Sequence, residues 1–162
     1  MTDIDPKTFW RLMGSRPLGV PVVAARGPDG PAGFLALSVT HVSAQPPSML
    51  VCVSRSTSAL DAIRSSGAFA ISYLPEGAED VADIFGGRRG IAGADRFGQG
   101  QWKTGATGSP VFGAATATFE CAVSATFSHD DTEIIVGRIT AYSTDESVMP
   151  LVMFGGKFRK LS

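Results

Sequence analysis

The residues most suited to chemistry lie in the stretch from Gly33 to Ser58, GFLALSVTHVSAQPPSMLVCVSRSTS. Its last residues, Ser54–Ser58, bring hydroxyls, backbone N–H groups and the guanidinium of Arg55 together between an apolar segment and the start of an expected helix. Free N–H groups at a helix start attract anions, and an adjacent arginine can hold a phosphate through two hydrogen bonds. Because the neighbouring apolar runs supply walls, the stretch predicts a half-apolar, half-anion-binding site for a planar phosphorylated cofactor.

Simpler explanations of these hydroxyls and charges remain open from the sequence. Serine and threonine are common helix caps, so Ser54–Ser58 can serve only to start the helix that follows. The C-terminal cations Lys157 and Arg159 can be solvated tail charges, or they can close over a phosphate if the last strand lies beside that loop. The position of Arg55 directly after an apolar strand favours the anion site.

Other catalytic and nucleotide-binding motifs are incomplete. The glycines of Gly98-Gln-Gly100 are followed by Lys103 where a dinucleotide fingerprint needs its third glycine, and Gly155-Gly156-Lys157 lacks the first glycine of a P-loop. The histidines His41 and His129 have no Gly-x-Ser-x-Gly elbow beside them and no metal-ligand spacing with the cysteines. We therefore predict neither a hydrolase nor a metal site, and we assign no catalytic residue.

Composition bounds the class of protein. The chain has 162 residues, 44% hydrophobic and 18% charged, as expected for one globular domain over residues 1–162. A formal net charge of -1 argues against nucleic acid or an anionic membrane as a partner. The longest apolar runs, such as Met49–Val53, are too short to cross a bilayer, and the acidic N-terminus lacks the apolar centre of an export signal. Cys52 and Cys121 lie in apolar patterns typical of buried reduced thiols, so we expect a cytoplasmic protein.

The elements that must position these residues are mostly strands. Expected strands cover Leu18–Ala25, Ala32–Leu37, Met49–Val53, Phe69–Leu74, Ala115–Phe127, Glu133–Tyr142 and Pro150–Phe154. Expected helices follow Asp5-Pro6 and cover Ser58–Ser66 and Glu76–Phe85. The glycine-rich segment Gly86–Gly108 has no periodic pattern and should be a long loop. Strands with only a few short helices predict a mainly β fold, either an antiparallel barrel or a folded-over sheet.

In the order of its motifs the chain resembles the flavin-reductase-like family, from about Phe9 to Leu161. The family's ring-contacting strand, its Val-Ser-x-Pro-Pro segment and its Cys-Val-x-Arg-Ser-Ser run correspond to Gly33–Ser38, Val42–Pro47 and Cys52–Ser58. Further family motifs follow in the same order at Gly67–Ser72, Asp80–Gly86, Asp95–Phe97, Gly137–Ile139 and Gly156–Phe158. No single motif is specific, whereas the ordered set is.

The resemblance implies an antiparallel FMN-binding split β-barrel that forms a homodimer. It implies an NAD(P)H:flavin oxidoreductase with FMN, or alternatively FAD, as flavin and NADH or NADPH as reductant, which can serve a flavin-dependent oxygenase. In such a protein one strand would lie along the isoalloxazine ring, one loop would surround the phosphate, and a rim and the C-terminal strand would complete the site. The residues implied are Phe34, Leu35, Ala36, Leu37, Ser38, Val53, Ser54, Arg55, Ser58, Phe85, Gly86, Gly87 and Lys157.

Some positions depart from the family pattern. Leu35 and Leu37 stand where members often have threonine and serine or asparagine, and Thr132 stands where many have a histidine near the nicotinamide site. These departures keep open a flavin-binding or electron-transfer protein without reductase turnover. A third hypothesis is an FMN oxidase similar to the pyridoxamine-phosphate oxidases, which also use an FMN split barrel. The ordered motifs favour the reductase.

Overall fold

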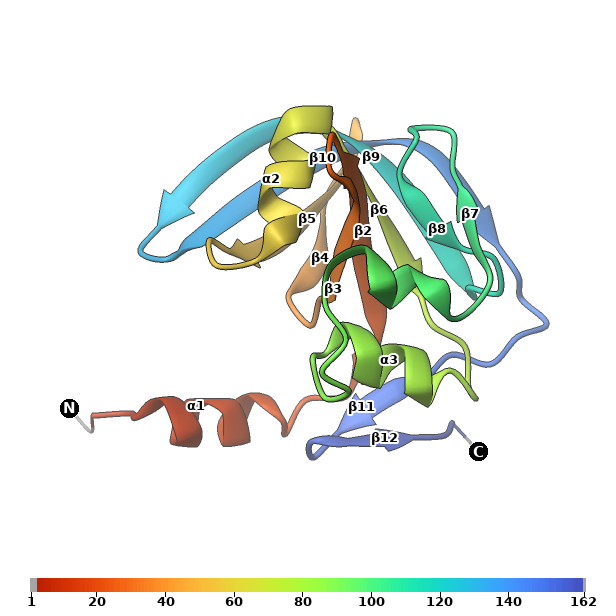
Figure 1. Ribbon diagram of the computed structural model, residues 1–162. Coiled ribbons are helices and arrows are strands. Elements are labelled where there is room, and N and C mark those ends of the chain that lie inside the picture. Colours follow the sequence, from red (N-terminus) through yellow and green to blue (C-terminus); the bar gives the residue numbers. More distant parts are fainter. Residues whose placement is uncertain (1–2, 162) are drawn as a thin grey trace.

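The computed structural model describes residues 3–161 and is built mainly of antiparallel strands (Figure 1). The largest sheet has seven strands, in the spatial order β3 (Gly30–Leu35), β2 (Pro21–Gly27), β6 (Ala68–Tyr73), β9 (Ala117–His129), β10 (Thr132–Thr144), β5 (Pro47–Ser54) and β4 (Val39–Ala44). Every neighbouring pair in this sheet is antiparallel. The predicted mainly β, antiparallel fold is therefore confirmed.

Two small sheets and four helical segments complete the fold. The small sheets are formed by β1 (Leu18–Gly19), β11 (Val152–Phe154) and β12 (Lys157–Arg159), and by β7 (Trp102–Thr104) and β8 (Pro110–Phe112). The helical segments are α1 (Pro6–Met13), α2 (Ser58–Ser66), α3 (Glu79–Phe85) and the 3-10 helix η1 (Gly93–Gly98). None of the helices within residues 3–161 is both long enough and apolar enough to cross a membrane.

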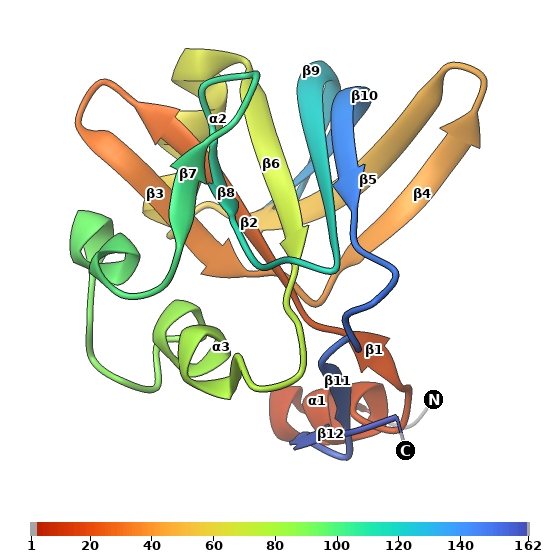
Figure 2. The same cartoon turned by 90° about the vertical axis from the view of Figure 1, so that its right-hand side faces the viewer.

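The large sheet has an opening on one side, because its edge strands β3 and β4 do not pair with each other. Figure 2 shows β2 and β3 towards one side of the molecule and β4 and β5 towards the other, with β6, β9 and β10 between them. The residues between β3 and β4 cross this opening, because the N–H of Ala36 donates to the Pro21 carbonyl at 3.0 Å while the N–H of Cys52 donates to the Ser38 carbonyl at 3.2 Å. The crossing segment is thereby fixed to both β2 and β5, which makes it a rigid wall.

Helix α2 covers one face of β2 and β3, and its bounds are those predicted. Leu60 and Ile63 are almost fully buried in a core cluster with Phe69. The helix ends at Gly67, whose φ of 66° lies in the left-handed region that glycine adopts without strain. Burial of this apolar stripe fixes the N-terminus of α2 close to the end of β5.

Several sequence predictions need correction. The expected strand Leu18–Ala25 is divided between β1 and β2, and the expected helix from Glu76 begins only at Glu79. The C-terminal cations expected in a tail lie in β12, which pairs with β11 across a turn of Gly155 and Gly156. Both glycines have positive φ, of 63° and 71°, as a two-residue hairpin turn requires.

The segment expected to be one long loop contains η1 and β7. Aromatic packing folds it: the ring centroid of Trp102 lies 4.9 Å from that of Phe97, 5.0 Å from that of Phe85 and 5.3 Å from that of Phe112. These partners lie within the segment or just outside its two ends, at irregular spacings that leave no periodic pattern. A sequence window therefore does not reveal them.

Candidate functional site

The crossing segment between β3 and β4 forms one wall of a cavity of about 440 Å³, which we call the strand groove. It is lined by Trp10, Phe34, Leu35, Ala36, Leu37, Ser38, Cys52, Ser54, Thr57, Asp131 and Thr132. Burial raises the pKa of the Cys52 thiol, so this side chain is a neutral part of the wall and not a thiolate nucleophile. Trp10 and the run Phe34–Leu37 give the groove an apolar side, which suits a flat hydrophobic ring system, while the other residues supply hydroxyls and one carboxylate.

A second cavity of about 360 Å³, the loop cavity, lies at the N-terminus of α2. It is lined by Phe34, Ser56, Thr57, Ser58, Phe85, Gly86, Gly87, Ala92, Gly93 and Arg96. Phe34 and Thr57 line both cavities, so the two are contiguous. One ligand can therefore occupy the apolar groove and reach the hydroxyls and the guanidinium of the loop cavity.

The N-terminus of α2 keeps its donors available. Thr57 is the N-cap residue, but its side chain makes no capping hydrogen bond. The Ser54 and Ser56 hydroxyls lie 2.9 Å apart, and the N–H of Ser56 donates to Ser54 Oγ at 3.3 Å. Side-chain capping therefore does not explain the run. The N–H of Leu60 donates to the Thr57 carbonyl at 3.0 Å, whereas those of Ser58 and Ala59 remain available to an anion.

Arg96 supplies the positive charge of the loop cavity. Its Nε donates to the Ile91 carbonyl at 2.9 Å, and its Nη1 donates to the Gly33 carbonyl at 3.1 Å. These bonds hold the half-buried guanidinium between β3 and η1. A guanidinium fixed in this way loses little further conformational entropy when it binds an anion.

Close backbone packing at Gly33 keeps this arrangement compact. A Cβ atom built on Gly33 would lie 2.9 Å from the Val23 carbonyl oxygen and 3.1 Å from ring atoms of both Phe85 and Phe97. Only a residue without a side chain therefore allows α3 and η1 to approach β3 so closely. This approach brings the rim glycines and Arg96 to the loop cavity.

Arg55 takes part in a separate charge cluster. Its Nε donates to Glu133 Oε1 at 2.9 Å, and Arg64 Nη2 lies 3.2 Å from the same oxygen. The Ser128 hydroxyl lies 3.1 Å from both carboxylate oxygens of Glu133. The bond from Arg55, aided by Ser128 and Arg64 and opposed by burial, holds the pKa of the Glu133 carboxyl below its ordinary value of 4.5. The cluster joins the loop after β5 to β10 and to α2.

The structure brings most of the cofactor residues implied by the sequence together around the two cavities. Those that line one or both are Phe34, Leu35, Ala36, Leu37, Ser38, Ser54, Ser58, Phe85, Gly86 and Gly87. Three others line neither cavity. Val53 is fully buried in the core, Arg55 is bound to Glu133, and Lys157 is exposed on β12. Within residues 3–161, no group of three or more metal-ligating side chains is placed to hold an ion.

Sequence reasoning missed two residues of the site. Trp10 lines the strand groove from α1, and its side chain is otherwise largely exposed. The motif Asp95–Phe97 contains Arg96 but predicts no role for it. Its place in a glycine-rich segment is a weak signal, because Arg88 and Arg89 lie in the same segment.

Comparisons with known proteins identify the family of this chain. A family model described as a flavin reductase like domain matches residues 13–162. The FMN reductase (NADH) RutF of Stutzerimonas stutzeri is 36% identical over 143 residues, which cover 88% of this chain and 81% of the relative.

Solved structures give the same result. The NADH:FAD oxidoreductase SgcE6 of Streptomyces globisporus has a TM-score of 0.89 at 30% identity, covering 100% of this chain and 98% of that one. BorF, the flavin reductase component of a bacterial two-component tryptophan halogenase, has a TM-score of 0.88 at 32% identity, covering 97% and 98% of the two chains. The match of the family model and the agreement in fold over almost the entire chain show that this chain belongs to the family of flavin reductase like domains.

Proposed function

We propose that this chain is a flavin reductase that binds FMN and takes NADH as its reductant. One observation carries the proposal: the apolar strand groove opens, at Phe34 and Thr57, onto a loop cavity that holds hydroxyls, a helix N-terminus and the guanidinium of Arg96. A planar ring with a phosphate attached by a short chain fits this combination. The names of the relatives support the activity, since RutF is an FMN reductase (NADH) and SgcE6 is an NADH:FAD oxidoreductase.

The fit of FMN assigns a role to each part of the site. Residues Leu35–Ser38 lie along the ring, and the free polar groups of this backbone meet its edge. Ser56 and Ser58, with the first N–H groups of α2, bind the phosphate. Arg96 makes the direct charged contact with the phosphate. Arg55 adds positive charge nearby while Glu133 holds it.

The leucines at positions 35 and 37 are compatible with this role. Both pack against the core cluster that contains Phe85 and Leu151, and both also line the groove. At these two positions, where other members often have a hydroxyl or an amide, this chain has apolar side chains. Binding of the flavin ring then rests on backbone hydrogen bonds and on apolar contact.

The proposed reaction requires the site to align two rings, that of the flavin and that of the nicotinamide, rather than to transfer protons. A flavin held by these residues would supply the redox chemistry, the capacity to accept a hydride. The residues of the strand groove hold the two rings in the geometry for transfer and exclude water from them. Thr132 lies at the edge of the groove, where its hydroxyl donates to Asp131 Oδ1 at 3.2 Å. A threonine does not titrate near neutral pH, so it can position a ligand but not exchange protons with it.

The proposal also covers the oligomeric state of the protein, its location in the cell and its partner. We propose a homodimer in the cytoplasm that supplies reduced flavin to an oxygenase, as one domain over residues 1–162. The amphipathic helix α1 has no buried residue, and Phe9, Trp10 and Leu12 are 43%, 65% and 43% exposed. Such a face suits a second copy of the chain. BorF, itself a reductase component of a two-component system, supports the oxygenase partner. Light scattering of the purified protein tests the dimer.

The test of the proposed activity is a spectrum. The purified protein is mixed with FMN, and NADH is then added without oxygen. We expect the visible absorption band of oxidised flavin to disappear as NADH reduces it. A bound flavin that stays oxidised with both NADH and NADPH would instead identify a flavin-binding protein without reductase activity. In a separate assay in air, oxidation of an amine in place of NADH, with O2 reduced to hydrogen peroxide, would identify an oxidase.

A further inference from the structure

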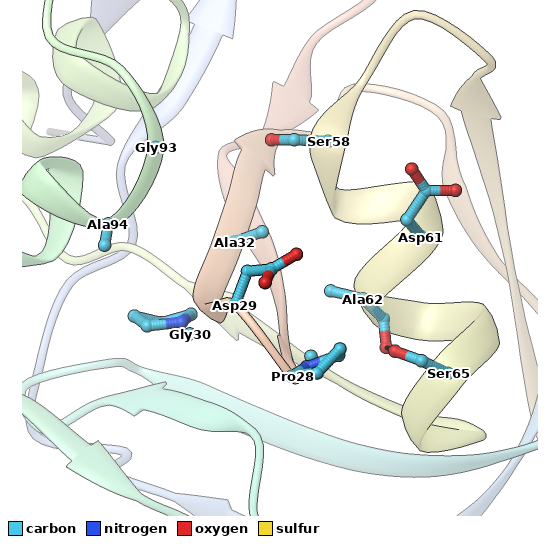
Figure 3. A pocket seen from close by; sticks show the side chains of 12 residues that line it. Pro28, Asp29, Gly30, Ala32, Ser58, Asp61, Ala62, Ser65, Gly93 and Ala94 are labelled. Atoms are coloured by element: carbon cyan, nitrogen blue, oxygen red, sulfur yellow. Dashed lines mark hydrogen bonds between the residues drawn. The ribbon is translucent and has the colours of Figure 1, made fainter.

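A third cavity, which we call the hairpin cavity, lies beside the proposed flavin site. It has a volume of about 320 Å³, at the lower end of the range of about 300–1,000 Å³ that is usual for ligand pockets. Figure 3 shows its two main walls, the turn between β2 and β3 on one side and α2 on the other. Gly93 and Ala94, at the start of η1, border it as well.

The residues that line the hairpin cavity have small side chains, and most of them are uncharged. They consist largely of glycine, alanine and proline, including Pro28, Pro31 and Ala62. At Gly27 the hairpin lies directly against the helix, because a Cβ atom there would be 3.1 Å from Ala62 Cα. This contact closes one end. A flat group can lie against such a surface without meeting long side chains.

The polar side chains of the cavity are two carboxylates and the hydroxyls of Ser58 and Ser65. The carboxylates of Asp29 and Asp61 stand on opposite walls, and neither forms an ion pair with any residue in the range 3–161. The Ser65 hydroxyl donates to the Ala62 carbonyl at 3.1 Å, which leaves its oxygen as an acceptor. Such a site repels a second anion and favours a neutral ligand rich in hydroxyl or amino donors. A carboxylate that accepts from ribose hydroxyls is a common solution for nucleosides.

The hairpin cavity and the loop cavity are contiguous. Ser58 and Gly93 line both. The molecule thus presents three connected regions in order: an apolar groove, a cavity with cationic and hydroxyl groups, and a cavity with small walls and two carboxylates. A ligand that extends through all three must carry a planar ring, then phosphate, then a neutral polyhydroxylated group.

We propose that the hairpin cavity is a nucleoside subsite, which holds the adenosine half of a flavin dinucleotide and makes FAD a tighter ligand than FMN. The inference rests on the proposed function, since it places the flavin ring in the strand groove. Asp29 and Asp61 accept hydrogen bonds from the ribose hydroxyls or the adenine amino group, and the small walls contact the base. The adenosine half of NADH offers the same chemistry, so the experiment separates the two sources.

The experiment measures dissociation constants of FAD and FMN for the complete chain by flavin fluorescence, together with the KM for NADH. The wild type should bind FAD at least about tenfold more tightly than FMN, as one or two hydrogen bonds to carboxylates allow. The variant Asp61→Ala should lose most of that preference and keep its affinity for FMN. A second variant, Ala94→Phe, should do the same by filling the cavity. Asp80→Ala is the matched control, because this exposed aspartate lies on α3 and lines none of the three cavities.

The possible results are distinct. Equal affinity of the wild type for FMN and FAD, with flavin still reduced by NADH, would overturn the subsite and leave the proposed function intact. A rise in the KM for NADH in Asp61→Ala, with both flavin affinities unchanged, would assign the cavity to the nicotinamide dinucleotide and overturn the flavin assignment. Failure of the wild type to bind any flavin would overturn the proposed function itself.

Discussion

The Nε atom of Arg55 lies 2.9 Å from Oε1 of Glu133, a carboxylate whose side chain is only 3% exposed. The arginine follows β5, and the carboxylate lies near the start of β10, so the bond joins the loop of the proposed phosphate site to the neighbouring strand. A buried carboxylate without its partners is costly, which makes the whole cluster cooperative. The loop therefore keeps its shape before any ligand arrives.

Replacement of Glu133 should make the stability of the fold depend less on pH in the acidic range. The folded pKa of Glu133 is lowered, so its contribution to stability is present above about pH 4.5 and is lost as the pH falls through the folded pKa. We expect Glu133→Gln to lower the melting temperature at neutral pH and the difference from wild type to shrink below about pH 4.5. Thermal unfolding monitored by circular dichroism across pH checks this. Glu146→Gln, at an exposed position, is the control and should show no such trend.

Replacement of Arg96 should weaken the binding of phosphorylated flavins specifically. Loss of a charged hydrogen bond to the phosphate should reduce the affinity for FMN by about 1.5–3 kcal/mol in Arg96→Ala. Riboflavin has no phosphate, and its affinity should change little. Arg88→Ala, on the same glycine-rich segment and 57% exposed, is the control. A larger loss in Arg55→Ala than in Arg96→Ala would show that Arg55 is the direct ligand instead.

Trp10 should report on the strand groove. Its side chain lines the groove, whereas Trp102 packs among Phe85, Phe97 and Phe112. Bound flavin should therefore quench the emission of Trp10 far more than that of Trp102. In a titration with FMN, Trp10→Phe should remove most of the quenching. Quenching that survives in this variant would place the flavin away from α1.

Gly33 should tolerate no side chain. A Cβ atom there would lie 2.9 Å from a backbone oxygen of β2 and 3.1 Å from two aromatic rings, so Gly33→Ala must displace β3 or the helices. We expect a loss of about 1–3 kcal/mol in the free energy of unfolding, measured in urea. Gly98→Ala is the matched control, since a Cβ atom on Gly98 meets nothing within 4 Å. Equal stability of the two variants would contradict the packing described.

Thr132 should make hydride transfer insensitive to pH near neutrality. No histidine is among the described residues that line the groove, although His129 lies opposite Thr132 on β9; the ordinary pKa of a histidine is about 6.5. The variant Thr132→His should introduce a new step in the pH profile of flavin reduction, centred at about pH 6–7. Stopped-flow reduction at saturating NADH measures it. A similar step already present in the wild type would contradict this assignment.

Local signals were sufficient for many elements. The N-cap Asp5, the proline that follows it and the stop at Gly67 place α1 and α2 where the structure has them. The order of strand patterns likewise predicted an antiparallel, mainly β fold. These features depend on neighbours in the chain, on caps, turn residues and periodicity, which a sequence displays directly.

Residues that act through distant contacts were beyond such reasoning. The role of Arg96 depends on its bond to the Gly33 carbonyl, 63 residues away in the chain. The different roles of the two arginines have the same origin. Arg55 is bound to a carboxylate that lies 78 residues away in the chain, and this contact keeps it out of the loop cavity. Such pairs form only when β3, η1 and β10 are brought together by burial of the core.

The sequence by itself determined the chemical types at the site: an apolar strand that ends at Ser38 and the hydroxyl and arginine run Ser54–Ser58. Their residue types and spacing are enough to predict an apolar wall beside an anion site. Only the tertiary structure decided that Arg96 faces the loop cavity, that Arg55 is held by Glu133, and that a third cavity continues past Ser58. The reason is physical: local patterns set the conformation of each segment, whereas packing between distant segments sets which side chains meet.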